Sequence, residues 1–230
     1  MNKSQGNMYD FVTHTANPIK GLCPHECSYC YMKDIFKRYG HNTTLLRLDT
    51  NELNVNYGSG KFIFLGSSTD MFAQPVESAW IKQVLDHCAQ FDCKYLLQTK
   101  NPARFLEFLN HPLMQDKNKV VLATTIETNR DVSGISKAAS IEERVKAMAD
   151  LSQLGFGVMI TMEPIMDFDH DDVINIMRTI MPFQVNIGAN TSKTVKLPEP
   201  DKNKLNALIA ELKTFVPVVK LKPNLDRLLK

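Results

Sequence analysis

The chain has 230 residues, of which 43% are hydrophobic and 23% are charged, and its formal net charge is +2. This length suits one globular domain, and the composition excludes a disordered or fibrous protein. The small net charge does not require a polyanionic partner, because local patches of charge decide such binding.

The amino-terminal segment 1–17 lacks the apolar core of a secretory leader and carries Asp10 and His14 instead. No stretch approaches the roughly 18 uninterrupted apolar residues of a membrane span. We therefore expect a soluble, cytoplasmic protein with no membrane partner. The five cysteines are then not expected to form a disulfide framework.

Three of these cysteines, Cys23, Cys27 and Cys30, lie within eight residues. Clustered thiols in an intracellular protein usually bind metal. Gly21 and Pro24 indicate that the segment is an irregular loop, which can wrap around a ligand.

Two kinds of metal centre compete for these thiols. A structural zinc ion needs four ligands, so His14, His25 or His41 would have to complete its site. An iron–sulfur cluster of the 4Fe–4S type, held by three thiolates, leaves one iron open to a small molecule. Thiols without any metal are the third alternative.

Downstream of this loop, short apolar runs alternate with amphipathic segments. The runs are mostly β-branched or aromatic, which suits strands buried on both faces of a parallel sheet. They cover residues 62–65, 95–97, 120–123, 158–160, 185–187 and 216–219. Helices are predicted over 75–91, 140–154, 169–181 and 201–215. Pro75 suits a first helical turn, Ser140 and Glu143 form a capping box, and Gly155 ends that helix.

This alternation predicts right-handed βαβ units, which build either a barrel or a doubly wound sheet. No Gly-rich phosphate loop follows the first run, which disfavours a dinucleotide-binding sheet. Polar residues follow nearly every run, at the strand ends where (β/α) barrels form their sites. We therefore predict an α/β fold, a partial (β/α) barrel of about six parallel strands. It forms a single domain over 1–230, with the cysteine loop after the first strand.

The spacing Cys-x3-Cys-x-aromatic-Cys, with Tyr29 as the aromatic residue, resembles the signature of radical S-adenosylmethionine (SAM) enzymes. The whole chain resembles a short, phage-associated branch of these enzymes, of unassigned activity and related to spore photoproduct lyases. Segments 17–21, 66–70, 98–100, 125–129, 162–164 and 186–189 carry this wider resemblance. It implies a 4Fe–4S cluster on Cys23, Cys27 and Cys30 whose open iron binds SAM. An electron from the cluster would then cleave SAM to a 5′-deoxyadenosyl radical.

The same resemblance implies contacts with SAM. Gly66, Ser67 and Ser68 match the segment that meets the SAM amino group, and Lys100 matches a lysine that pairs with the SAM carboxylate. The other implied contacts are the ribose with Thr125 and Glu127, the adenine with Tyr29, and unspecified parts of SAM with Glu163 and Asn190.

Two further cysteines, Cys88 and Cys93, test the likeness to spore photoproduct lyases, which use a cysteine outside the cluster as a hydrogen donor. Cys88 falls on the apolar stripe of a predicted helix, where free cysteine is commonly a small buried hydrophobe. Cys93 precedes its strand, at the end opposite the predicted site. The sequence therefore does not favour lesion repair by that mechanism.

Residues 193–230 hold nine Lys or Arg against four Asp or Glu, whereas the rest of the chain holds 18 against 21. A basic tail can follow a phosphate backbone, but Lys202, Lys204 and Lys213 also fit a solvated helix face. Nucleic acid is thus a candidate substrate, and the expected electron donor is a reductase or a flavodoxin-type protein. Two alternatives are a zinc-stabilised nucleic-acid-binding module that uses His25 or His41, and a non-catalytic barrel that binds other proteins.

Overall fold

The computed structural model describes residues 1–4, 9–33, 35 and 45–230. Within these ranges, eight strands form one sheet in the order β1-β2-β5-β6-β7-β8-β9-β10, and β3 and β4 form a separate antiparallel pair. The strands are β1 (Asn2–Lys3), β2 (His14–Ala16), β3 (Ile19–Lys20), β4 (Arg47–Leu48), β5 (Ser59–Leu65), β6 (Asp92–Gln98), β7 (Val120–Thr125), β8 (Gly157–Met162), β9 (Gln184–Ile187) and β10 (Val218–Leu221).

Strand β1 runs antiparallel to β2, and every other neighbouring pair in the main sheet is parallel. Each of the six predicted runs overlaps one of the strands β5 to β10, and β2 adds a seventh parallel strand in the described ranges. The cysteine loop follows β2, after the short strand β3. The prediction of an α/β partial barrel is confirmed.

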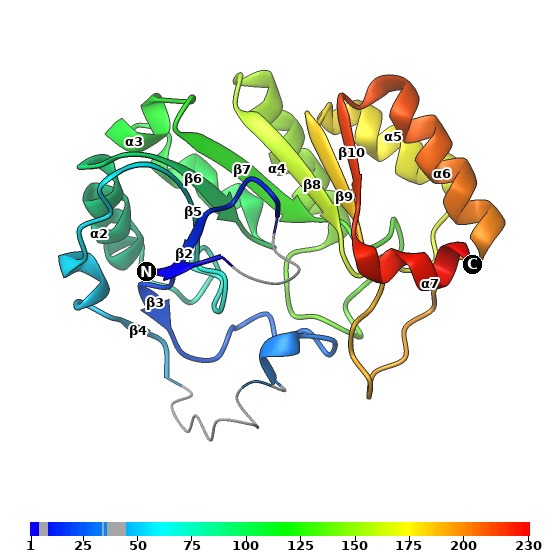
Figure 1. Cartoon of the computed structure of the whole chain (residues 1–230), viewed down its shortest axis with the longest axis horizontal. Helices are drawn as coiled ribbons and strands as arrows, with labels where there is room; N and C mark the ends of the chain where they lie inside the picture. Colours follow the sequence, from blue (N-terminus) through cyan, green and yellow to red (C-terminus); the bar gives the residue numbers. More distant parts are fainter. Residues whose placement is uncertain (5–8, 34, 36–44) are drawn as a thin grey trace.

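Helices cover the outer side of this sheet (Figure 1). The loops at the carboxyl ends of its parallel strands gather around the cysteine segment, which is drawn in blue (Figure 1). The described helices are α2 (Ser78–Ala89), α3 (Pro112–Gln115), α4 (Ile141–Gln153), α5 (His170–Ile180), α6 (Lys202–Phe215) and α7 (Asp226–Leu229), with short 3-10 turns η1 (Glu52–Asn54), η2 (Pro102–Phe108) and η3 (Pro223–Leu225). None of the helices in the described ranges is long and apolar enough to cross a membrane.

The cap predicted for α4 is confirmed. The Ser140 hydroxyl accepts a hydrogen bond from the Glu143 N–H at 3.2 Å, and the Glu143 carboxylate accepts from the Ser140 N–H at 2.8 Å. Gly155 follows the helix with a φ of +82°, a conformation that L side chains rarely adopt, and so ends it.

Two predicted boundaries were wrong. Helix α2 begins at Ser78 and does not include Pro75. The carbonyls of Ala73 and Gln74, just before it, accept hydrogen bonds at 2.7 and 2.9 Å from the buried Arg104 guanidinium, which holds this segment in turns. Strand β10 begins after Pro217, because proline has no N–H to donate to the sheet.

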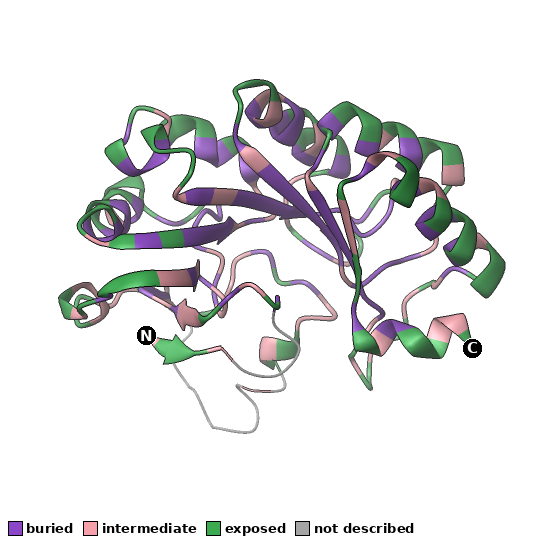
Figure 2. Ribbon diagram, turned by 45° about the horizontal axis from the view of Figure 1, so that its top comes forward, coloured by how far each residue is buried: buried purple, intermediate pink, exposed green. Residues whose placement is uncertain are grey.

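Apolar side chains pack on both faces of the sheet, so its central strands are buried (Figure 2). On the outer face they contact the helices and form the larger core. On the inner face a smaller cluster forms where Tyr9 and Val12 pack on Leu96, Ala123 and Met159. Tyr9 and Val12, from the segment before β2, therefore fill part of the inside of the partial barrel.

Candidate functional site

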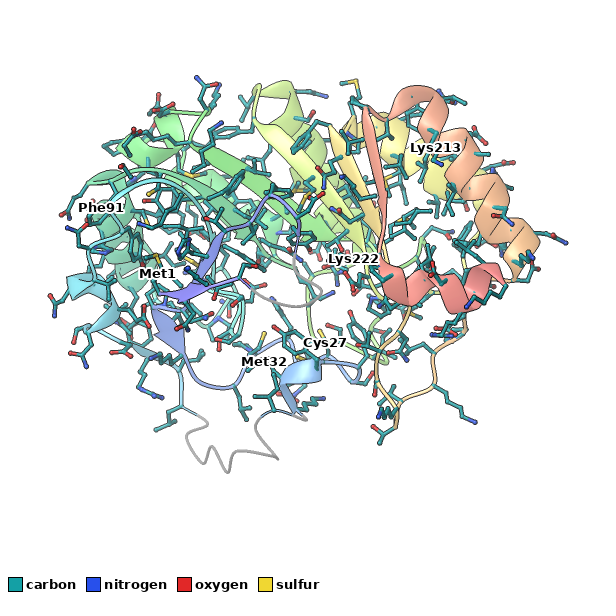
Figure 3. All side chains as sticks on the ribbon, viewed as in Figure 1. Met1, Cys27, Met32, Phe91, Lys213 and Lys222 are labelled. Atoms are coloured by element: carbon teal, nitrogen blue, oxygen red, sulfur yellow. The ribbon has the colours of Figure 1, made fainter. Side chains whose placement is uncertain are left out.

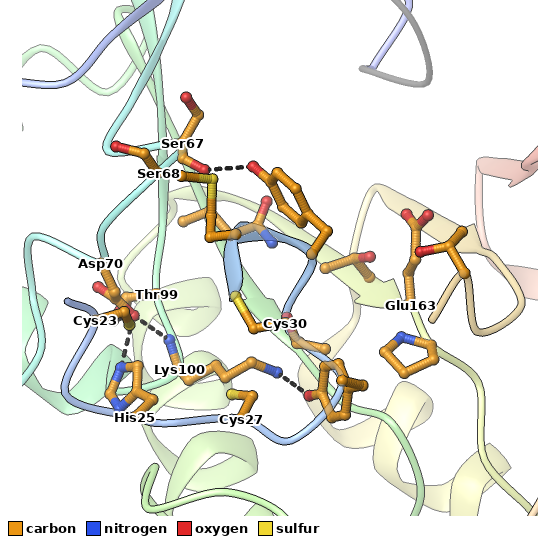
Figure 4. A pocket seen from close by; sticks show the side chains of 18 of the residues that line it. Cys23, His25, Cys27, Cys30, Ser67, Ser68, Asp70, Thr99, Lys100 and Glu163 are labelled. Carbon is orange, nitrogen blue, oxygen red and sulfur yellow. Dashed lines mark hydrogen bonds and ion pairs between the residues drawn. The ribbon is translucent and has the colours of Figure 1, made fainter. Parts of the chain in front are cut away.

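A cavity of about 500 Å³ lies at the carboxyl ends of the parallel strands, and the cysteine loop forms one of its walls. Figure 4 shows the three thiols of this loop on one side and Glu163 on the other. Its lining includes most of the predicted site residues, namely Cys23, Cys27, Cys30, Tyr29, Gly66, Ser67, Ser68, Lys100, Thr125, Glu163 and Asn190. The structure therefore brings together polar strand ends that are far apart in the sequence.

The cysteine loop is fixed by backbone contacts with the segment that follows β7. The N–H of Ser28 donates to the carbonyl of Ile135, and the N–H of Lys137 donates to the carbonyl of His25, both at 2.8 Å. Gly21 at the start of the loop has a φ of +116°, and a Cβ there would lie 2.4 Å from the carbonyl oxygen of Leu45. Glycine is therefore required where the loop leaves β3.

The three thiols differ in their surroundings. Burial raises the pKa of the Cys23 thiol to about 12 and also raises the pKa of Cys30. Cys27 is buried, and its Sγ lies 3.2 Å from the Ser136 hydroxyl oxygen. Metal binding would have to displace the thiol protons, as it does in other thiolate sites.

The donor set fits an iron–sulfur cluster. Thiolates are the soft ligands that such clusters use, and each thiolate binds a different iron, so the three sulfurs need not meet at one point. In the described ranges, no three side chains of His, Cys, Asp or Glu converge on the position of a single metal ion.

The histidines considered as zinc ligands have other contacts or lie elsewhere. His25 Nε2 is 2.7 Å from Asp70 Oδ2, and His14 in β2 has its Nδ1 2.9 Å from the Thr13 hydroxyl. His41 lies outside the described residues.

The loop after β5 presents Gly66, Ser67 and Ser68 to the cavity. Gly66 has a φ of +76°, and a Cβ there would lie 3.0 Å from the carbonyl oxygen of Thr69. The Asn17 side-chain oxygen accepts hydrogen bonds from the Ser68 N–H at 2.9 Å and from the Ser67 hydroxyl at 3.2 Å. This tight turn holds both serines in the lining of the cavity.

Asp70 joins three segments of the site, a role that sequence reasoning missed. Its carboxylate accepts hydrogen bonds from the Thr99 hydroxyl at 2.9 Å and from the Lys100 N–H at 2.8 Å, in addition to its contact with His25. Burial alone would raise the pKa of this carboxyl, but these contacts, His25 first, hold it below its ordinary value. The signal available in the sequence was a carboxylate soon after a buried strand.

Lys100 and Tyr29 meet at a buried carboxylate, that of Glu127. The Lys100 ammonium donates to the Tyr29 hydroxyl at 2.8 Å, and both groups donate to Glu127 Oε1. The other carboxylate oxygen accepts from Arg144 Nη1 at 2.8 Å. Burial alone would raise the pKa of the Glu127 carboxyl, but the two cations lower it to about 2.

Glu127 was predicted to hold the ribose of SAM, and the structure corrects this placement. Its side chain is 0% exposed and does not line the cavity, because Lys100, Tyr29 and Arg144 surround it. Thr125, the other residue predicted to contact the ribose, does line the cavity.

The wall opposite the cysteine loop contains a second pair of charged groups. Lys222 Nζ lies 3.8 Å from Glu163 Oε2 and 4.5 Å from the centre of the Tyr9 ring, and its side chain is 9% exposed. Figure 3 shows Lys222 and Cys27 at the same end of the sheet. Burial raises the pKa of Glu163 and lowers that of Lys222, while each group opposes the shift of the other.

The sequence indicated Lys222 only as part of a basic tail, and Tyr9 was not identified at all. The helix face predicted for the tail is partly correct. Lys202 and Lys213 are exposed, whereas Lys204 is half-buried and its Nζ lies 2.7 Å from Asp167 Oδ1.

The two remaining cysteines lie where they were predicted to lie, away from the cavity. Cys88 is fully buried on α2, a helix on the outer side of the sheet. Cys93 is buried near the amino end of β6, where its Sγ approaches the carbonyl oxygen of Gly58 at 3.6 Å. Neither residue lines the cavity.

Residues 7–155 match the model of a family described as "Protein of unknown function (DUF5131)". No curated protein matches the chain in sequence. Among solved structures, a spore photoproduct lyase mutant with bound SAM and a dinucleoside spore photoproduct is similar with a TM-score of 0.66 at 10% identity, over 94% of this chain and 78% of that one. SuiB of Streptococcus suis bound to SAM is similar with a TM-score of 0.56 at 11% identity, over 90% of this chain and 46% of that one. At these identities the similarity is one of fold.

Proposed function

Since the chain belongs to the DUF5131 family, whose function is unknown, we propose from its own site that it is a radical SAM enzyme. Cys23, Cys27 and Cys30 would hold a 4Fe–4S cluster, and SAM would occupy the adjoining cavity. The observation that carries this proposal is the position of all three thiols on one wall of a 500 Å³ cavity at the carboxyl ends of parallel strands. Cavities of this size hold small molecules and cofactors.

The residues for SAM are proposed from the cavity lining. Ser67 and Ser68 would meet the amino group, Lys100 the carboxylate, Thr125 the ribose and Tyr29 the adenine. Glu163 and Asn190, which also line the cavity, would meet other parts of SAM. Lys100 suits the carboxylate, because a charge-assisted hydrogen bond fixes both the position and the orientation of an anionic group.

The bound cluster would supply an electron for reductive cleavage of SAM. The chain's own residues would orient SAM and restrict water, because Tyr9, Tyr31 and Phe64 contribute apolar surface to the same cavity. A substrate would enter from the strand ends, and near-attack geometry requires it to lie directly beside the radical carbon.

A nucleic-acid substrate and a reductase or flavodoxin-type electron donor belong to this proposal. The excess of basic residues over 193–230 supports the former. The similar fold of a lyase structure that contains a dinucleoside also supports it. The phage association rests on the sequence resemblance alone.

The test is anaerobic reconstitution of the full chain with iron and sulfide, followed by reduction in the presence of SAM. We expect about four irons and four sulfides per chain and the formation of 5′-deoxyadenosine. Stoichiometric zinc without acid-labile sulfide would contradict the proposal, and so would a reduced, fully loaded protein that leaves SAM intact.

A further inference from the structure

Four side chains from four segments form one continuous set of polar contacts that runs from the cavity lining into the protein interior. Tyr29 comes from the cysteine loop, Lys100 follows β6, Glu127 follows β7, and Arg144 lies on α4. Glu127 is at the centre of the set and contacts each of the other three.

The members of this set differ in how far they are buried. The side chains of Glu127 and Arg144 are 0% exposed, whereas that of Lys100 is 15% exposed and lines the cavity. Arg144 is itself fixed, because its Nε donates to the Ala139 carbonyl at 2.7 Å and its Nη1 also donates to the Thr125 carbonyl at 3.0 Å. Removing one partner of a buried ion pair strongly destabilises a protein. The Glu127 carboxylate is therefore held in place beside Arg144.

We infer that Glu127 is a positioning residue: held by Arg144, its carboxylate sets the position of the Lys100 ammonium and joins it to Tyr29 of the cysteine loop. This inference rests on the proposed function, because Lys100 is the residue proposed to meet the SAM carboxylate. Glu127 itself does not touch SAM.

The charge balance of this set explains how Lys100 can contact both Glu127 and an anionic group of the ligand. One carboxylate faces two cations, Lys100 and Arg144, so the set carries a net positive charge. An ammonium has three N–H donors. Two of them point to Glu127 and Tyr29, and among the described residues no other side chain accepts from the ammonium, so the third can donate to an anionic group in the cavity. Long lysine side chains lose considerable rotamer entropy when they are fixed, and Glu127 removes that cost before the ligand arrives.

The test is a double-mutant cycle on the reconstituted full chain, with SAM affinity measured by anaerobic calorimetry. The four proteins are the wild type, Glu127→Gln, Lys100→Ala and the double variant. We expect Lys100→Ala to weaken SAM binding at least tenfold and Glu127→Gln to weaken it threefold to tenfold. In the Lys100→Ala background, Glu127→Gln should have less than a twofold effect, because the group that it positions is gone.

Iron and sulfide content and the EPR signal of the reduced cluster provide the independent readout. The iron content should stay at the wild-type level in Glu127→Gln, while the change that SAM causes in the EPR signal should be reduced. Glu142→Gln is the matched control, since Glu142 is exposed in the first turn of α4, two residues from Arg144. It should leave both the affinity and the spectrum unchanged.

The outcomes separate the two proposals. The positioning role is wrong, and the proposed function stands, if the wild type binds SAM but the affinity losses of the two single variants add in the double variant. The same holds if Glu127→Gln leaves the SAM affinity unchanged or raises it. If the loaded wild type does not bind SAM, the proposed function fails and this inference fails with it.

A milder variant serves if Glu127→Gln does not fold. Tyr29→Phe removes only the hydroxyl that bridges Lys100 and Glu127. Its effect on SAM affinity should likewise be lost in the Lys100→Ala background. Additive losses in this second cycle would overturn the inference in the same way.

Discussion

The charged groups on the two walls of the cavity are paired in different ways. On the wall of the cysteine loop, the buried carboxylate of Glu127 faces the two cations Lys100 and Arg144. On the opposite wall, Glu163 Oε2 lies 3.8 Å from Lys222 Nζ. Asp70 adds a second carboxylate to the first wall, so these carboxylates and cations are equal in number on each wall, and the walls differ in how closely the pairs are held.

The same difference appears in the ionisation of the two carboxyl groups. The pKa of Glu127 is lowered to about 2 by its cations despite complete burial, whereas burial raises the pKa of Glu163 against the weaker opposition of Lys222. The wall that holds the thiols is thus organised in advance around fixed charges. The opposite wall retains a carboxyl that is easier to protonate.

Loss of any cysteine of the loop should have the largest effect. Replacing Cys23, Cys27 or Cys30 with alanine should abolish the broad visible absorption of the reconstituted protein, because a 4Fe–4S cluster on three thiolates does not tolerate the loss of one. The matched control is the double change Cys88→Ala and Cys93→Ala, which should leave cluster content and SAM cleavage intact. A cysteine-loop variant with full iron and sulfide content would show that the ligands are assigned wrongly.

Lysine substitutions on the two walls should separate SAM binding from other contacts. Lys100→Ala should weaken SAM binding at least tenfold, since hydrogen bonds to charged groups contribute about 1.5–3 kcal/mol. Lys222→Met, on the opposite wall, should change it less than twofold. Calorimetry on reconstituted proteins measures both values, and equal losses would refute the distinction between the walls.

The acid dependence of stability should have opposite signs for the two carboxyl groups. The lowered pKa of Glu127 stabilises the folded chain fully above the ordinary value of 4.5, and this contribution, on the order of 3 kcal/mol, is lost as the pH falls toward about 2. Glu127→Gln should therefore flatten the loss of stability in acid. The raised pKa of Glu163 means that its ionisation destabilises the folded chain above pH 4.5, so Glu163→Gln should be neutral or stabilising at pH 7.

Urea unfolding of the wild type and both variants between about pH 3 and pH 7 measures how the free energy of unfolding depends on pH. Parallel pH profiles of Glu127→Gln and the wild type would show that the Glu127 carboxyl is not stabilised by its cations.

Glycine substitutions should give the smallest effects and again distinguish the walls. In Gly66→Ala the new Cβ would have a positive φ and lie 3.0 Å from a backbone oxygen, so we expect a loss of about 1–3 kcal/mol in stability and weaker SAM binding. In Gly188→Ala the new Cβ would lie 2.9 Å from the flexible Glu163 side chain, which can shift, so the loss should stay below about 1 kcal/mol.

Gly134→Ala is the control for both changes, because nothing lies within 4 Å of its Cβ position. Thermal unfolding compares the three variants. A larger loss for Gly188→Ala than for Gly66→Ala would mean that the wall opposite the thiols is the more rigid one.

The sequence by itself determined the elements whose signals are local. Six strands followed from their apolar runs, the start of α4 from the capping box of Ser140 and Glu143, and the metal hypothesis from the spacing of three cysteines. Such patterns can be recognised because the residues that define them lie within one turn or one strand of each other. A strand before the cysteine loop was expected, but the position of β2 could not be located, because it has three residues and no apolar run, and its partner β5 lies more than forty residues away.

Only the tertiary structure decided which side chains face the cavity. Thr125 ends β7 and Glu127 lies only two residues further on, yet Glu127 is buried under Lys100 and Arg144 whereas Thr125 lines the site. Tyr9 and Lys222 meet across more than two hundred residues, and no local pattern indicates such a contact. The physical reason is that a charged side chain takes its position from its partners. Those partners are set by the order of strands in the sheet rather than by neighbours in the chain.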